Sequence, residues 1–175
     1  SKASNKIIKK IRATFSKNKK LITYFGFIFP HKGIEQIFDI ADPKRDHVIL
    51  ISTFKQNDPY HVELKNKIYS LGAWKDSFTV TGFIESSKVA DILMASDAVL
   101  LPFRTETTLR NGSVFAAMLQ GTPIVTTSKN RQGYEPELNI FFNKPNDIFG
   151  MKSSLNELIS NKTIKKRTNL LTWRD

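Results

Sequence analysis

The chain has 175 residues, of which 40% are hydrophobic and 25% charged, and this composition fits one globular domain with its own core. It contains no cysteine, which excludes disulfides and thiolate metal sites. No apolar run is long enough to suggest a membrane-spanning helix.

The net charge of +11 is concentrated at the two ends of the chain. Residues 1–20 carry eight lysines or arginines and no acid, and residues 161–175 carry five against one aspartate. Residues 21–160 are therefore nearly neutral, which argues against nucleic-acid binding because that function needs a basic patch on the folded body. We interpret the ends as solvated basic segments; the alternative is a peripheral contact with anionic lipid.

Hydrophobic spacing and turn residues predict a regular alternation of elements after an amphipathic helix over 6–16 that packs on its neighbour. In chain order we expect a strand over 21–28, a helix over 34–41, a strand over 47–53, a helix over 59–71, a strand over 78–80, a helix over 86–95, a strand over 98–101, a helix over 113–119, a strand over 124–126, a short strand over 139–142 and a helix over 148–159. This pattern predicts an α/β fold, a Rossmann-like doubly wound parallel sheet of about six strands with helices on both faces.

The segment 97–127 is the most informative part of the sequence. Asn111-Gly112-Ser113 follows a buried strand and opens a helix, with Ser113 as the expected cap, and Gly121 ends that helix. Free backbone N–H groups and the helix dipole attract phosphates at such a helix start. Because it follows the carboxyl end of a parallel strand, we expect a nucleotide to bind there.

Lys32 is the second candidate for phosphate binding. It follows the first predicted strand and precedes Gly33 at the start of the next helix. The alternative interpretation is a solvated loop lysine. On the other loop, Arg104 or Arg110 could supply a further positive charge.

The same segments carry a family resemblance. Asp97, Pro102, the run 121–123 and Val125 match the donor-binding segment of retaining glycosyltransferases with two Rossmann-like domains, the GT-B fold of family GT4 or glycosyl transferases group 1. The stretches 21–33 and 80–93 resemble two further motifs of that family, and Trp173 stands where the family has a Ser-Trp before its closing helix. The resemblance covers about residues 20–173.

Two family glutamates are absent from this chain, because their positions are taken by Thr108 and Ala116. The loop is similar to a family variant with Arg-x-Gly-Ser, here residues 110–113. The resemblance implies three segments: a basic linker or surface helix over 1–20, a nucleotide-sugar-binding domain over 21–160, and a basic segment over 161–175 that leads to a closing helix.

The resemblance also implies a function. We expect the donor-binding half of a retaining glycosyltransferase of bacterial surface polysaccharide or glycoconjugate synthesis, cytoplasmic or peripheral on the inner face of the membrane. It would bind a nucleotide-diphospho-sugar of the UDP or GDP type without a metal or cofactor. A glycan or lipid-linked acceptor would bind through an N-terminal half, without which this half would be inactive.

Residue roles follow from the matched motifs. The expected catalytic residues are Lys32, Glu106 and Arg104. The expected donor contacts are Phe27, Lys32, Gly82, Phe83, Ile84, Thr108, Arg110, Asn111, Gly112, Ser113 and Val114. Phe27 takes the place of a family arginine, and Glu106 is either a substitute near the donor sugar or a surface glutamate. Phe83 either helps to receive the base or belongs to the core.

Two alternative functions remain open. Thr108 and Ala116 also suit a non-catalytic relative that binds a nucleotide or a protein partner, and a GT-B nucleotide-sugar 2-epimerase is the other possibility. The three histidines show no metal-ligand spacing, so we expect no zinc or iron site. The absence of a Gly-x-Gly-x-x-Gly fingerprint disfavours a nicotinamide dehydrogenase.

Overall fold

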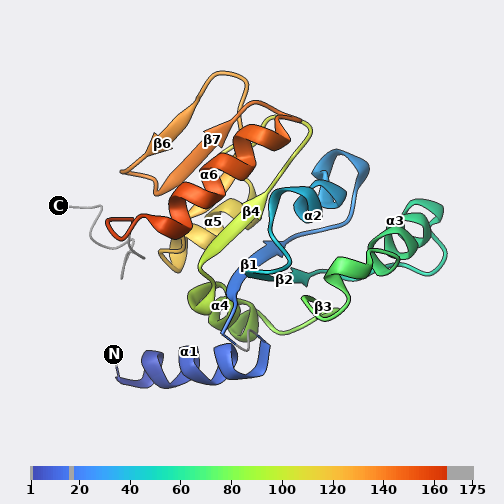
Figure 1. The fold of residues 1–175 in the computed structure, drawn as a ribbon, viewed down its shortest axis with the longest axis horizontal. Coiled ribbons are helices and arrows are strands. Elements are labelled where there is room, and N and C mark those ends of the chain that lie inside the picture. Colours follow the sequence, from blue (N-terminus) through green and yellow to red (C-terminus); the bar gives the residue numbers. More distant parts are fainter. Residues whose placement is uncertain (1, 16–17, 165–175) are drawn as a thin grey trace.

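A computed structural model describes residues 2–15 and 18–164, which form an α/β domain built on a seven-stranded sheet (Figure 1). The strands are β1 (Lys20–Phe25), β2 (Asp46–Ile51), β3 (Phe78–Val80), β4 (Ala98–Leu101), β5 (Ile124–Thr127), β6 (Gly133–Glu135) and β7 (Ile140–Asn143). The α-helices are α1 (Lys2–Phe15), α2 (Ile37–Ile40), α3 (Pro59–Tyr69), α4 (Ser86–Ala95), α5 (Gly112–Leu119) and α6 (Ile148–Ser160). Three 3₁₀ turns are η1 (Pro30–Lys32), η2 (Ile34–Gln36) and η3 (Gly72–Trp74).

The strand order is β3-β2-β1-β4-β5-β7-β6, and all neighbours are parallel except the antiparallel pair β6 and β7. The chain therefore runs outward from β1 on one side, returns through α4, and continues outward from β4 on the other side. This reversal makes the carboxyl ends of β1 and β4 a topological switch point, and open α/β sheets bind their ligands in the crevice outside such a point. The predicted doubly wound fold is confirmed.

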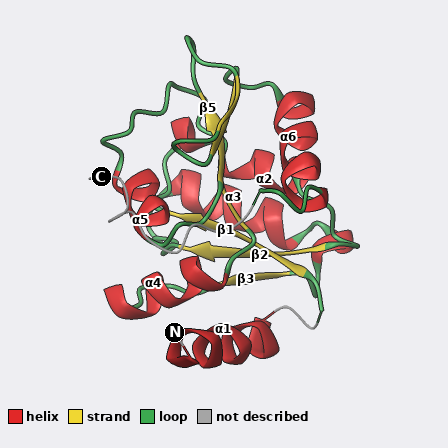
Figure 2. Cartoon of the chain, turned by 90° about the vertical axis from the view of Figure 1, so that its left-hand side faces the viewer, coloured by secondary structure: helices red, strands yellow, loops and turns green. Residues whose placement is uncertain are grey.

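The strands are apolar because both faces of the sheet are covered by other parts of the chain. Every residue of β2, β4, β5 and β7 is buried. Helices α5 and α6 lie on opposite sides of the sheet, so strands between them have no face toward water (Figure 2).

The segment after β1 differs from the prediction. The single helix expected over 34–41 is instead the 3₁₀ turn η2 followed directly by the short α2, and the turn η1 precedes them. Gly33 separates the two turns with a left-handed backbone (φ +63°), which interrupts helical hydrogen bonding. The apolar face that the sequence indicated, Ile34, Ile37, Phe38 and Ala41, is nevertheless buried.

The other differences concern boundaries and one strand. β1 ends at Phe25, three residues earlier than predicted, because a turn begins at Gly26. The edge strand β6 was not predicted, since three residues next to a glycine give no periodic signal.

The helix predicted over 6–16 is α1, which begins four residues earlier than expected. It packs against α4, and its apolar side chains Ile8, Ile11 and Phe15 contact the core. Arg12 also forms an ion pair of 2.8 Å with Asp97, just before β4.

The predicted segment around Trp173 lies outside the described residues. None of the described helices is long and apolar enough to cross a bilayer.

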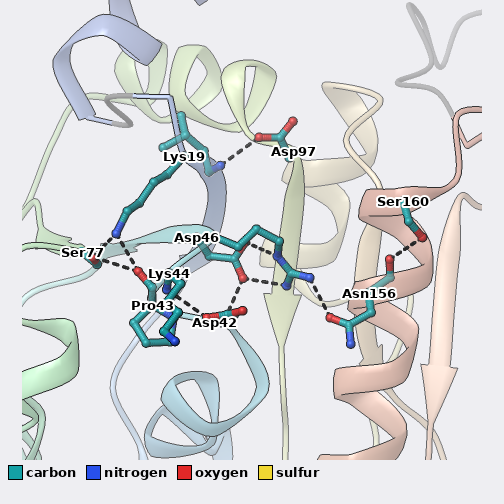
Figure 3. A network of polar contacts seen from close by, with 11 residues as sticks. Lys19, Asp42, Pro43, Lys44, Asp46, Ser77, Asp97, Asn156 and Ser160 are labelled. Carbon is teal, nitrogen blue, oxygen red and sulfur yellow. Dashed lines mark hydrogen bonds and ion pairs between the residues drawn. The ribbon is translucent and has the colours of Figure 1, made fainter.

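A polar network ties the amino ends of the strands to the helices (Figure 3). Asp46 is fully buried and accepts hydrogen bonds from the backbone N–H of Asp42 (2.9 Å) and from Nε and an Nη of Arg45 (both 2.8 Å). The other Nη of Arg45 donates to Asn156 on α6 (2.7 Å). The hydrogen bond to Asp46 raises the pKa of Arg45 above its usual value. The pair therefore joins β2 to α6.

We predict that Asp46→Asn destabilises the domain by about 2 kcal/mol, because it leaves the Arg45 guanidinium without its buried counter-charge. Urea unfolding measures this change. Asp39→Asn, which removes an exposed carboxylate on α2, is the control and should change stability by less than about 0.5 kcal/mol. Equal effects of the two substitutions would show that the network does not stabilise the fold.

Candidate functional site

The loops after β1 and β4 are held together by backbone contacts. The Arg104 N–H donates to the His31 carbonyl (2.8 Å). Gly33 lies so close to the Pro102 carbonyl oxygen that a Cβ atom would collide with it. We call residues 31–33 and 102–104 the loop clamp. It brings Lys32 and Arg104, predicted from separate motifs, to the same crevice.

Helix α5 begins beside the end of β1. Asn111 is its cap, and the Asn111 side chain accepts a hydrogen bond from the Ser113 N–H (3.0 Å). The prediction that Ser113 is the cap is therefore wrong, because the asparagine two residues earlier performs that role. The Ser113 hydroxyl is largely buried, and a Cβ atom on Gly26 would lie only 2.9 Å from it. The exposed Gly112 leaves the amino end of α5 open.

Lys32 presents a partly buried positive charge. Its Nζ lies 4.1 Å from the centre of the Phe103 ring, a cation–π contact. Burial lowers the pKa of Lys32 below that of an ordinary lysine. No carboxylate of the described residues lies within ion-pair distance of Lys32. An anion at this site would therefore meet a charge that is not already neutralised.

Arg104, in contrast, is engaged in a polar network that the sequence did not reveal. Its guanidinium forms an ion pair with Glu35 of η2 and donates to the Asn146 side-chain oxygen (3.0 Å). The Tyr60 hydroxyl donates to the other oxygen of Glu35 (3.3 Å). Burial, together with the negative charge of Glu35, raises the pKa of Tyr60 to about 12. Gln36 also donates to Asn146 (3.0 Å).

The middle of the β4–α5 loop lies toward β5. Glu106 is exposed and accepts a hydrogen bond from the Ser128 hydroxyl (3.4 Å). Thr107 is buried, with its hydroxyl 2.7 Å from that of Thr126. Thr108 and Arg110 are exposed, so both are available to a ligand.

The remaining predicted donor contacts are spread along the same edge of the sheet. Gly82, Phe83 and Ile84 follow β3, which β2 separates from β1. Phe83 is 90% exposed, so the alternative that it belongs to the core is wrong. Phe27 is 77% exposed. Val114 is fully buried, which leaves only its backbone to contact a ligand.

His61 connects two of the loops at the carboxyl edge of the sheet. His61 accepts a hydrogen bond from the Lys55 N–H at Nδ1 (2.8 Å), and its Nε2 therefore donates to the Ile28 carbonyl (2.9 Å). This neutral ring joins the loops after β1 and β2. Among the described residues, no group of three His, Asp or Glu side chains could hold a metal ion.

A doubly wound, mostly parallel sheet with this strand order defines a Rossmann-like domain. Residues 19–161 match the family "glycosyl transferases group 1", and the chain belongs to this family.

Known proteins agree with this assignment. The 2-deoxystreptamine glucosyltransferase of Streptomyces kanamyceticus is 28% identical over 108 residues, which cover 59% of this chain and 26% of that protein. The fold resembles Anabaena Alr3699/HepE in complex with UDP and glucose (TM-score 0.73, 22% identity), covering 91% of this chain and 44% of that one. It also resembles the C-terminal domain of the group 1 protein LpcC from Francisella tularensis (TM-score 0.66, 20% identity), covering 83% of this chain and 77% of that one. The chain thus spans about a quarter of the matched glucosyltransferase and less than half of Alr3699/HepE.

We predict that Gly33→Ala destabilises the domain by about 2 kcal/mol or more, because alanine is strained at this φ and its Cβ would push against the Pro102 carbonyl. Thermal unfolding measures the effect. Gly72→Ala is the matched control, since a Cβ atom there meets nothing within 4 Å. A stable Gly33→Ala protein would contradict the close approach of the two loops.

Proposed function

We propose that the chain is the donor-binding domain of a retaining glycosyltransferase and binds a nucleotide-diphospho-sugar at the crevice between β1 and β4. The observation that carries this proposal is the placement of Lys32 and the amino end of α5 on the two loops of that crevice. Family membership and the fold shared with Alr3699/HepE, which was solved with UDP and with UDP-glucose, support it.

The proposed chemistry depends on stabilising the negative charge of the leaving diphosphate. When a glycosyl group leaves its donor, negative charge builds up on the diphosphate. The open N–H groups of α5, the positive end of the helix dipole and the Lys32 ammonium would stabilise that charge in a preformed geometry. No catalytic metal is required in this proposal. UDP is the first nucleotide to test because Alr3699/HepE binds it.

The other parts of the donor would lie along the same edge. The base would reach the loop at Gly82–Ile84, in which Phe83 is exposed, and the sugar would lie toward Glu106 on the β5 side. The acceptor, a glycan or lipid-linked sugar in bacterial surface polysaccharide or glycoconjugate synthesis, would bind through a second domain. Transfer would then need that domain.

A second candidate function is a non-catalytic relative that keeps nucleotide binding. Thr108 and Ala116 favour it, since neither side chain can act as a carboxylate. Donor hydrolysis or transfer by a longer protein containing this domain would exclude this candidate, whereas nucleotide binding without either would support it.

We predict that the domain binds UDP and that Lys32→Ala weakens binding about tenfold or more, because it removes a charge-assisted contact to the diphosphate. Ligand-observed NMR with UDP, GDP, ADP and dTDP, with chelator present, measures binding and ranks the nucleotides. Lys75→Ala removes an exposed lysine on the turn after η3 and should leave binding unchanged. Failure of all four nucleotides to bind would contradict the proposal.

The lowered pKa of Lys32 gives a pH dependence. Only the protonated amine attracts the diphosphate, so affinity for UDP should fall as the pH rises through the pKa of Lys32. That fall should begin below the pH at which an ordinary lysine, with a pKa of about 10.4, loses its proton. Lys32→Arg stays charged and should keep its affinity to higher pH. Identical pH profiles of the two proteins would rule out Lys32 as the titrating group.

A further inference from the structure

A UDP-type ligand carries two or more negative charges on its diphosphate, and Lys32 supplies only one positive charge. The next cation along the loop clamp is Arg104, whose backbone N–H is bonded to His31, the neighbour of Lys32. The position of the Arg104 backbone is therefore fixed relative to Lys32. The position of its guanidinium depends on the groups that hold the side chain.

Those groups come from three other segments. Glu35 of η2 pairs with one Nη of Arg104, and Asn146, between β7 and α6, accepts from the other. Tyr60 of α3 donates to the second oxygen of Glu35, so the carboxylate has little freedom to turn away. The Glu35 side chain is only 19% exposed, against 39% for Arg104. Glu35 is thus the more firmly held member of the pair.

Asn146 contributes a second fixed contact to the Arg104 side chain. Asn146 has a left-handed backbone (φ +65°), which is uncommon outside glycine, and its side-chain oxygen accepts from both Arg104 and Gln36. Gln36 is 4% exposed, and its second side-chain atom, Oε1, has no hydrogen-bond partner in the described structure.

We propose that Glu35 is a positioning residue for the donor site: it holds Arg104 beside Lys32 as the second cation for the diphosphate. This inference rests on the proposed function. Arginine has five N–H donors, and the contacts to Glu35 and Asn146 use one N–H on each of the two terminal nitrogens. The remaining N–H groups suit a phosphate oxygen, and a guanidinium already fixed in place loses less entropy on binding.

The decisive variant is Glu35→Gln, with Asp39→Asn as the matched control. Each removes one negative charge from the segment between β1 and β2, and simple charge attraction predicts that both tighten UDP binding slightly. The positioning role predicts the opposite for Glu35→Gln: a loss of affinity for UDP of about three- to tenfold, measured by calorimetry. Glu35→Asp, which restores the carboxylate, should recover part of that loss.

A double-mutant cycle with Arg104→Gln identifies the residue through which Glu35 acts. Arg104→Gln alone should weaken UDP binding, and Glu35→Gln should add almost nothing in that background. Tyr60→Phe, which removes only the hydroxyl on Glu35, should weaken UDP binding about twofold and provides a milder test if Glu35→Gln does not fold.

The outcomes separate the two proposals. Unchanged or tighter UDP binding by a folded Glu35→Gln protein, or an equal loss with and without Arg104, would overturn the positioning role while leaving the donor site intact. Absence of UDP, GDP, ADP and dTDP binding by the wild-type protein would overturn the proposed function and the positioning role together.

Discussion

The close approach of Gly33 to the Pro102 carbonyl is the contact on which the candidate site depends. It joins the segment after β1 to the loop after β4, and these are the two strands between which the chain reverses direction. A side chain at residue 33 would separate the two loops. Lys32 and the loop that leads to α5 would then belong to different regions of the surface instead of one crevice.

The two ends of the sheet have different chemistry. At the amino ends of the strands, the buried Asp46 is paired with the partly exposed Arg45, and this pair fastens α6 to the sheet. At the carboxyl ends, Lys32 has no carboxylate partner among the described residues, and the amino end of α5 is open. The carboxyl edge therefore keeps a positive charge and open N–H groups that an anionic ligand could contact.

The sequence predicted the elements whose signals are local. β4, α5 and β5 were found because apolar runs, the Asn-Gly-Ser turn and Gly121 lie within one short stretch. The 3₁₀ turns after β1 were not predicted, because a turn of three residues is too short for hydrophobic spacing to distinguish it from the start of an α-helix. The edge strand β6 was missed because it is short and has a partner on one side only.

The candidate site was predictable only in part. Motif positions identified Lys32, Asn111 and Ser113. Glu35 and Asn146, in contrast, lie 69 and 42 residues from Arg104 in the sequence. No spacing rule joins residues so far apart; the sheet topology does. The predicted roles of Phe27, Glu106 and Thr108 stay predictions; the fold places these residues on the loops that follow β1 and β4.

The most direct test of the donor site is an amide NMR titration of this chain with UDP. If the diphosphate binds where we propose, the largest shift changes will be at Gly33, Gly112 and Ser113, while Asp46 at the opposite edge will not change. Shift changes confined to the amino ends of the strands, or none at saturating UDP, would contradict a donor site at the crevice between β1 and β4.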